Sequence, residues 1–335
     1  MTADAMSEVL GLSEQLSWGT RVEAPTVAAD RPIVLLGMGG SGMAARVGAL
    51  AADPVRLVVV HSSYGLPGWA VSERALVVAV SYSGNTEETL SGVAEALAAG
   101  LPVAAITSGG ALVDLADEED IAILSVPGDK QPRAAVGYQA SGVLAMLEAA
   151  GAVDDAAGQL VEAADVVARA LGDGNGAGYR LGIDIADALA GRISVIYGGH
   201  GVAALAAYRW KTQINENAKM PAYSGEIPEL NHNELEGWST LADSVNRSVG
   251  LVYLRDRHDH PRVAKRIDLT AVTIEDSVGT AGHVSSDGGG ALARFFSLAA
   301  VGDVASVAMA ESAGVDAGPV DVLEGFKQQL RGADS

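Results

Sequence analysis

Two short segments of this 335-residue chain combine Gly, Ser and Thr in a way that suits anion binding. Residues 37–42 read Gly-Met-Gly-Gly-Ser-Gly, residues 81–86 read Ser-Tyr-Ser-Gly-Asn-Thr, and each segment follows an apolar run. A strand that ends in such a turn and opens a helix presents unpaired N–H groups at the positive end of the helix dipole. The hydroxyls of Ser81, Ser83 and Thr86 add donors for the three oxygens of a phosphate monoester. We therefore expect a small phosphorylated ligand at these loops.

The same loops admit two other interpretations. Residues 37–42 match the G-x-G-x-x-G pattern of dinucleotide-binding folds, which also needs an acidic residue about 20 positions further on. The next strand, 56–60, is followed by His-Ser-Ser-Tyr, and Asp53 comes before it. A nicotinamide cofactor is therefore disfavoured, and we expect no cofactor. Ordinary strand-to-helix turns also use Gly and Ser, although two such turns in one unit weaken that explanation.

A polar constellation interrupts the apolar pattern later in the chain. Glu216 stands in Asn-Glu-Asn at the end of a predicted helix, and His232 stands in Leu-Asn-His-Asn-Glu. Taken singly, Glu216 is explained by a solvated helix-end carboxylate and His232 by a loop histidine bonded to backbone. A metal site is disfavoured because the chain has neither His-x-His nor His-Glu-x-x-His. The His-Asp-His run at 258–260 precedes Pro261 and is better explained as a solvated turn.

A phosphate site with a carboxylate, a histidine and a lysine, and without metal or cofactor, suits aldose–ketose isomerisation of a sugar phosphate. The phosphate would anchor the substrate, so that remote binding energy orients the reacting end. The carboxylate would move a proton between C2 and C1 through an enediol. The histidine and the lysine would open the sugar ring and stabilise charge on its oxygens.

The apolar runs around these loops predict the sheet that must position them. The runs are rich in Val and Ile and continuous rather than alternating, as in strands that helices cover on both faces. They lie at 33–36, 57–60, 75–80, 102–106 and 121–126. Helix-like stretches such as 86–99 separate them, and this alternation predicts an α/β fold with a parallel sheet. Ligands of such sheets bind at the carboxyl ends of the strands, where both loops lie.

A second, shorter α/β pattern follows two predicted connecting helices. We expect those helices at 139–149 and 156–171, and strands at 193–197, 249–253 and 269–274.

The strand and Gly-rich turn at 193–201 repeat the order of 33–42, so we expect two similar halves. We place an N-terminal domain with the first phosphate loops at 1–153 and a C-terminal domain with the last helix at 154–335. The Gly-rich stretch 172–178 is a flexible break and a second candidate boundary.

Composition excludes several classes of protein. A chain of this length can bury two cores, and its 49% hydrophobic but only 4% aromatic residues indicate cores of Ala, Val and Leu. The net charge of −20 argues against a nucleic-acid surface. Without cysteines, disulfides, thiolate metal sites and a cysteine nucleophile are excluded.

The N-terminus has no basic region before an apolar stretch, so secretion is not expected. The longest apolar stretch, 295–310, is interrupted by Asp303 and predicts a buried helix rather than a membrane span. We expect a cytoplasmic protein with neither a nucleic-acid nor a membrane partner.

The two loops resemble the phosphosugar-binding SIS (sugar isomerase) domain. Residues 210–219 and 229–234 are more specific, and with them the chain is similar to the bifunctional phosphoglucose/phosphomannose isomerases over about 31–330. The resemblance implies two SIS-type subdomains, each a mostly parallel sheet flanked by helices in flavodoxin-like order. It also implies a hexose 6-phosphate substrate and a homodimer whose active sites use both subunits.

The resemblance assigns roles to nine residues. Those that match the family's phosphate-binding positions are Gly40, Ser41, Ser81, Ser83 and Thr86. Glu216 matches the base that moves the proton, and Arg133 matches an arginine that steadies the enediolate. His232 matches the ring-opening histidine supplied across the dimer interface. Lys327 matches the lysine of the C-terminal helix, whose apolar positions indicate docking.

One departure concerns substrate choice. Some family members carry a hydroxyl residue about two turns before the lysine, which is linked to handling both C2 epimers. Residues 318–321 read Gly-Pro-Val-Asp, without Ser or Thr, which favours glucose 6-phosphate over mannose 6-phosphate as the aldose. The alternatives are a diverged isomerase for another sugar phosphate and a non-catalytic SIS-type sensor. A sensor would need the phosphate loops but not Glu216, His232, Arg133 and Lys327 together.

Overall fold

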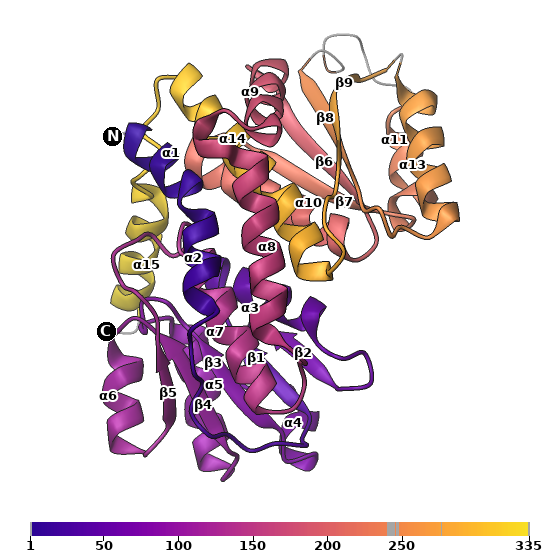
Figure 1. Ribbon diagram of the computed structural model, residues 1–335. Coiled ribbons are helices and arrows are strands. Elements are labelled where there is room, and N and C mark those ends of the chain that lie inside the picture. Colours follow the sequence, from indigo (N-terminus) through magenta and orange to yellow (C-terminus); the bar gives the residue numbers. More distant parts are fainter. Residues whose placement is uncertain (1, 240–244, 246–247, 276, 334–335) are drawn as a thin grey trace.

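A computed structural model describes residues 2–239, 245, 248–275 and 277–333 (Figure 1). The elements of its first part are α1 (Thr2–Leu10), α2 (Leu12–Gly19), β1 (Ile33–Leu36), α3 (Gly39–Ala51), β2 (Val58–His61), α4 (Trp69–Ser72), β3 (Leu76–Val80), α5 (Glu87–Ala98), β4 (Val103–Thr107), α6 (Ala111–Glu118), β5 (Ala122–Ser125), α7 (Val136–Ala149) and α8 (Ala156–Leu171). A 3₁₀ turn, Gly172–Gly174, follows α8.

The elements of the second part are α9 (Ala177–Leu189), β6 (Ile193–Gly199), α10 (Val202–Gln213), a π-helical turn (Ile214–Ala218), β7 (Ala222–Ile227), a 3₁₀ turn (Glu229–His232), α11 (Glu234–Gly237), β8 (Val249–Arg255), α13 (Pro261–Ile274), β9 (Gly279–Ser285), α14 (Ala291–Ser312) and α15 (Asp321–Ala333).

Two parallel sheets form the frame of the molecule. The first has the strand order β2-β1-β3-β4-β5, and the second has the order β7-β6-β8-β9. The second order therefore repeats the first without its last strand. The first is the flavodoxin-like order, and the predicted α/β fold of two parallel-sheet halves is confirmed. The division into domains at 153/154 stays a prediction.

Alternate residues of the first sheet face opposite helical layers, as the pleat requires. Ile33 and Leu35 pack with residues of α3 and α7. Val34 and Leu36 face the other way, toward a smaller cluster with residues of α5 and α6. Because helices cover both faces, the strands are apolar over most of their length, and this is why the sequence locates their ends to within one residue.

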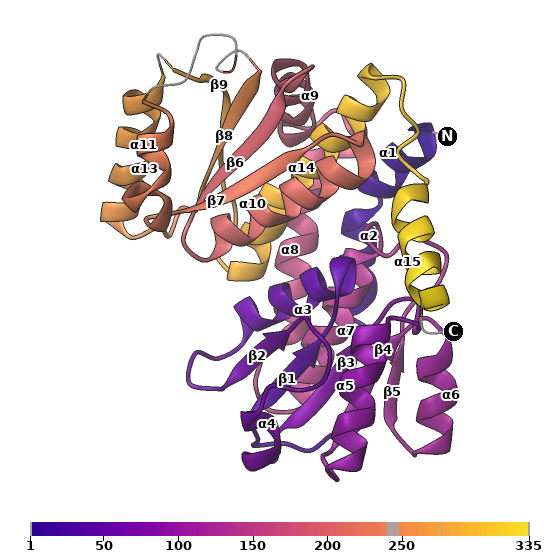
Figure 2. The same cartoon turned by 180° about the vertical axis from the view of Figure 1, so that it is seen from behind.

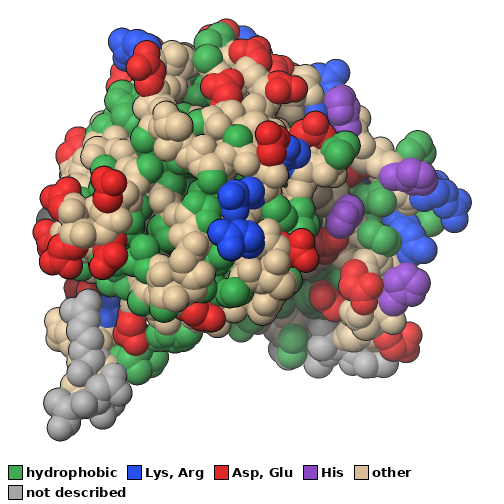
Figure 3. Space-filling view, turned by 90° about the horizontal axis from the view of Figure 1, so that it is seen from below, with side chains coloured by type: hydrophobic (Ala, Val, Ile, Leu, Met, Phe, Trp, Pro, Cys, Tyr) green, Lys and Arg blue, Asp and Glu red, His purple; other side chains and the backbone are tan. Residues whose placement is uncertain are grey.

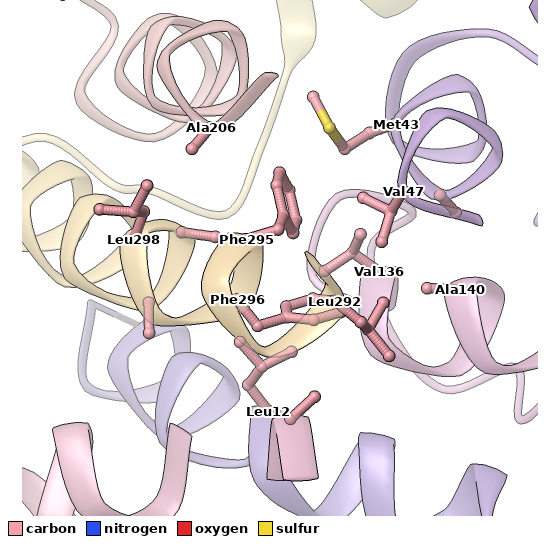
Figure 4. Packing of buried hydrophobic residues seen from close by; sticks show 14 of the residues in the cluster. Leu12, Met43, Val47, Val136, Ala140, Ala206, Leu292, Phe295, Phe296 and Leu298 are labelled. Atoms are coloured by element: carbon pink, nitrogen blue, oxygen red, sulfur yellow. The ribbon is translucent and has the colours of Figure 1, made fainter. Parts of the chain in front are cut away.

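One large core joins the two halves of the chain. Figure 4 shows Phe295 and Phe296 of α14 among Met43 of α3, Val136 of α7 and Ala206 of α10. Residues from both sheets belong to the same cluster. The loops of the first half are therefore held at a fixed distance from α10 and α14 of the second.

The helix predicted at 295–310 is buried, as expected. Among the described residues, α14 is the one helix whose length and composition would allow it to cross a membrane, and its apolar window is wholly buried in the protein. A buried core helix can have the same length and apolar composition as a membrane-spanning helix.

The second sheet differs from the prediction at three places. The strand expected at 269–274 is wrong, because these residues form the last turns of α13. The helix buries Ile267, Thr270 and Ile274 on one face and leaves Val272 64% exposed. The edge strands β7 and β9 escaped prediction because neither contains a continuous apolar run, and exposed residues interrupt the buried and half-buried ones in both.

Candidate functional site

The first loop lies directly against the segment that carries Arg133. α3 begins at Gly39, so the loop supplies the unpaired N–H groups of a helix start. A Cβ atom at Gly40 would lie 2.7 Å from the carbonyl oxygen of Pro132 and 3.0 Å from the nitrogen of Arg133. A larger residue would push these two backbones apart, so Gly40 allows their close approach.

Ser41 ties the two predicted phosphate loops together. Its side chain is buried, and Oγ donates to Gln139 Oε1 at 2.6 Å. The same oxygen accepts the N–H of Tyr82, in the second loop, at 3.0 Å. Because the hydroxyl is engaged within the protein, the group that Ser41 can offer an anion is its backbone N–H.

The second loop follows β3 and precedes α5. Ser81 Oγ donates to Thr86 Oγ1 at 3.0 Å, and this bond closes the turn. Ser83 is exposed, and Thr86 is half-buried. Gly84 has a φ of +68°, and a Cβ there would lie 1.8 Å from the carbonyl oxygen of Gly109. The loop shape therefore depends on glycine at this position.

Arg133 is a buried cation that connects the first half to the C-terminal segment. Its Nε donates to Asn217 Oδ1 at 2.8 Å. Its Nη2 donates to the carbonyl oxygens of Ala317 at 2.6 Å and Gly318 at 2.7 Å. Burial lowers the pKa of the Arg133 guanidinium, and the nearby Glu216 carboxylate opposes that change. Arginine nevertheless stays protonated in proteins.

Glu216 lies within reach of this guanidinium. Its Oε2 is 3.7 Å from Arg133 Nη1, and its side chain is 27% exposed. The residue belongs to the π-helical turn Ile214–Ala218 that continues α10. Such turns occur often at functional sites. The turn points Glu216 and its neighbour Asn217 to the same arginine, and Asn217 Nδ2 donates to Ser306 Oγ of α14 at 2.9 Å.

A cleft of about 600 Å³ opens beside Glu216. The turn that carries Glu216 forms one wall, and the segment 316–323 that leads into α15 forms the other. Lys219 bridges the walls, because its Nζ donates to the carbonyl oxygens of Glu216 and Pro319. Burial, followed by the charge of Arg133, lowers the pKa of Lys219.

Lys219 and Asn217 are site residues that the sequence prediction missed. Lys219 stands three residues after Glu216 and is one of only five lysines in the chain, which was the available signal. Its left-handed φ of +56° and its two backbone partners could not be inferred from sequence.

Two of the predicted site residues, His232 and Lys327, lie apart from Arg133 and Glu216. His232 ends the 3₁₀ turn Glu229–His232 and is exposed. Within the part of the chain that the structure describes, its ring has no hydrogen-bond partner. Figures 1 and 2 show α11, which follows this turn, on the opposite side of the molecule from α15. One chain therefore does not bring His232 to Glu216.

Lys327 also lies outside the cleft. It is exposed on α15, and its Nζ contacts Glu324 Oε1 at 2.7 Å. Among the residues that the structure describes, the docking expected for this helix is not seen, because Phe326 is 64% exposed and Leu323 47% exposed.

Acidic residues outnumber basic residues in the chain, and the surface reflects this excess. Figure 3 shows one face of the molecule with acidic side chains spread across it and basic side chains in small separate groups. Among the described residues, no group of three or more His, Asp and Glu side chains is arranged to hold a metal ion.

The paired parallel sheets and the Gly-, Ser- and Thr-rich loops define a SIS-domain protein. The SIS domain model matches residues 27–150, and the model of the bacterial phospho-glucose isomerase C-terminal SIS domain matches residues 181–330. The fold is also similar to the C-terminal domain of glucosamine-fructose-6-phosphate aminotransferase from Francisella tularensis. That match has a TM-score of 0.69 at 15% identity and covers 93% of this chain and 97% of the other.

The chain belongs to the bifunctional phosphoglucose/phosphomannose isomerase family. It is 35% identical over 312 residues to the bifunctional phosphoglucose/phosphomannose isomerase from Caldicellulosiruptor bescii. The aligned region covers 89% of each chain. It is also 32% identical over 238 residues to a D-glucosamine-6-phosphate 4-epimerase from Sulfolobus acidocaldarius, covering 71% of this chain and 73% of the other.

Proposed function

We propose that the protein is a cytoplasmic aldose–ketose isomerase that interconverts fructose 6-phosphate with glucose 6-phosphate and mannose 6-phosphate. The observation that carries the proposal is the 3.7 Å approach of Glu216 Oε2 to Arg133 Nη1, beside the loop that contains Gly40. A carboxylate and a fixed cation next to an anion-binding loop suit proton transfer on a phosphorylated sugar.

The phosphate binds at the two loops. The first-turn N–H groups at Gly40 and Ser41 and the hydroxyls of Ser83 and Thr86 donate to its oxygens. The buried Ser81 shapes this site, because its hydroxyl donates to Thr86 Oγ1. The bond between Ser41 Oγ and the Tyr82 N–H keeps the loops at one spacing. Binding energy from the phosphate then orients C1 and C2 of the open-chain sugar toward Glu216.

Glu216 moves the proton. Its carboxylate takes the proton from C2 of the aldose and returns it to C1 of the resulting cis-enediol, which gives the ketose; the reverse reaction runs from C1 to C2. Arg133 Nη1 donates to the enediolate oxygen as negative charge develops there. Because Nε and Nη2 are held by Asn217, Ala317 and Gly318, the guanidinium needs no reorganisation during the step.

His232 and Lys327 open the sugar ring in this proposal, and the protein is a homodimer with shared active sites. The separation of His232 from Glu216 within one chain favours supply of this histidine by the second subunit. The exposed apolar residues of α15 also favour a partner near Lys327. No step needs a metal ion or a cofactor.

A second candidate is the 4-epimerisation of an amino-sugar phosphate. It is favoured by the match to the Sulfolobus acidocaldarius epimerase. Both candidates share the phosphate loops, and they differ in the carbon at which stereochemistry or oxidation level changes.

An assay with several substrates tests the proposal. Fructose 6-phosphate is offered in the presence of EDTA, and glucose 6-phosphate and mannose 6-phosphate are followed separately; glucosamine 6-phosphate is offered in parallel. We expect both glucose 6-phosphate and mannose 6-phosphate, and a loss of about 10²–10⁴-fold in kcat for Glu216→Gln. Glucose 6-phosphate alone would contradict the proposed mannose 6-phosphate activity. Tight binding of a sugar phosphate without any product would instead establish a sensor. Conversion of glucosamine 6-phosphate alone, with its 4-epimer as the product, would establish the epimerase.

A further inference from the structure

The surface turn that carries His232 is anchored on both sides of that residue. On the N-terminal side, Leu230 is buried in the second-sheet core. Asn231 Nδ2 donates to Thr270 Oγ1 of α13 at 2.8 Å, and Asn231 Oδ1 accepts from Arg266 Nη1 at 3.4 Å. The backbone just before His232 is therefore fixed to α13.

On the C-terminal side, the anchor is a chain of hydrogen bonds that starts inside the protein. Trp238 Nε1 donates to the hydroxyl of Tyr197 at 3.0 Å. The same hydroxyl donates to Glu234 Oε2 at 2.8 Å. Tyr197 is 1% exposed in the middle of β6, so this carboxylate is tied to the frame of the second sheet. Asn233 Oδ1 accepts the N–H of Glu234 and caps α11, which begins directly after the turn.

The sheet is shaped around this tyrosine. A Cβ at Gly225 of β7 would lie 2.8 Å from the Tyr197 ring, so glycine leaves room for the ring beneath the edge strand. Burial and the Glu234 carboxylate raise the pKa of Tyr197, which keeps its hydroxyl protonated as a donor. Because the backbone is fixed before and after His232, the conformational freedom of this residue is limited to rotation about its side-chain bonds.

We propose that Glu234 and Tyr197 are positioning residues for His232. They hold the backbone of His232 so that its exposed ring is directed outward from the surface, toward the substrate in a second copy of the chain. The inference rests on the proposed isomerase function and on the role assigned there to His232. In this arrangement, position 234 must supply a hydrogen-bond acceptor for the Tyr197 hydroxyl, and a negative charge is not required.

Three variants test it by steady-state kinetics with fructose 6-phosphate. Tyr197→Phe removes only the hydroxyl, and Glu234→Ala removes the acceptor; we expect kcat to fall about tenfold in each, with KM changed less than twofold. Glu234→Gln keeps a carbonyl oxygen and should stay within about threefold of the wild type. Glu236→Ala is the matched control in α11, because its side chain is exposed and has no partner among the described residues, and it should have no effect.

A second set in the His232→Asn background separates positioning from a general structural role. If Glu234 acts through His232, Glu234→Ala lowers kcat no further in that background. A full additional tenfold loss there, or no loss in the wild-type background, overturns the inference. Absence of turnover by the wild-type chain overturns the proposed function together with the inference, whereas normal turnover with additive losses overturns the inference alone.

Discussion

Arg133 and Glu216 come from different halves of the chain, yet Nη1 of the arginine lies 3.7 Å from Oε2 of the glutamate. The large core around α14 fixes this approach, because it joins α3 and α7 of the first half to α10 of the second. Asn217 strengthens the link, since it accepts from Arg133 and donates to Ser306 of α14.

Arg133→Lys should separate charge from geometry at this position. A lysine keeps the charge but cannot reach Asn217 and both C-terminal carbonyls at once, so buried acceptors lose their partner. We expect the free energy of unfolding to fall by about 1–3 kcal/mol and kcat to fall about 10²-fold. Denaturant unfolding and steady-state kinetics measure the two effects. Arg21→Lys, at an exposed position, is the control; an unchanged kcat in Arg133→Lys would remove the arginine from the mechanism.

Lys219→Met should change how stability depends on pH. Since burial lowers the pKa of Lys219 below its ordinary 10.5, the unfolded chain binds this proton more tightly than the folded one. Between the two pKa values unfolding takes up a proton, so the contribution of Lys219 to the free energy of unfolding rises as pH rises through that interval. The stability of the wild type relative to Lys219→Met should therefore increase toward pH 10.5 in denaturant titrations. A difference that decreases over this range would contradict the lowered pKa.

Val320→Thr should shift substrate preference toward mannose 6-phosphate. Val320 lines the cleft beside Glu216 and stands seven residues before Lys327. A hydroxyl there adds a hydrogen-bonding group for the C2 oxygen of the mannose epimer, and one such bond corresponds to a change of about tenfold in relative kcat/KM. The ratio of the two products formed from fructose 6-phosphate measures it. Val161→Thr, on exposed α8 surface, is the control, and an unchanged ratio in Val320→Thr would exclude the site from epimer choice.

Shared active sites predict complementation between two inactive chains. Co-expression of Glu216→Gln with His232→Asn gives a heterodimer with one intact site, because the native Glu216 of one chain meets the native His232 of the other. About a quarter of wild-type activity should return at equal expression. Pairing His232→Asn with the Glu216→Gln/His232→Asn double variant is the matched control, since it yields no intact site. If the first mixture is no more active than its separate components, His232 does not act across the interface.

The sequence was most informative for strands that helices cover on both faces of the sheet. Strands of the first sheet are apolar on both faces, so their runs were located directly, whereas the polar edge strand β7 carried no such signal. The run at 269–274 has β-branched residues but buries Thr270 and Ile274 at helical spacing, and tertiary packing decided its structure. The contact between Arg133 and Glu216 depends on how the halves pack, which no local pattern specifies.

The most direct test of the central claim is deuterium incorporation during turnover in D₂O, followed by proton NMR. A proton carried by Glu216 exchanges in part with solvent, so glucose 6-phosphate formed from fructose 6-phosphate should gain deuterium at C2. Glu216→Gln should neither convert the sugar nor label it. Conversion by Glu216→Gln at an undiminished rate, with or without label in the product, would contradict proton transfer by this residue.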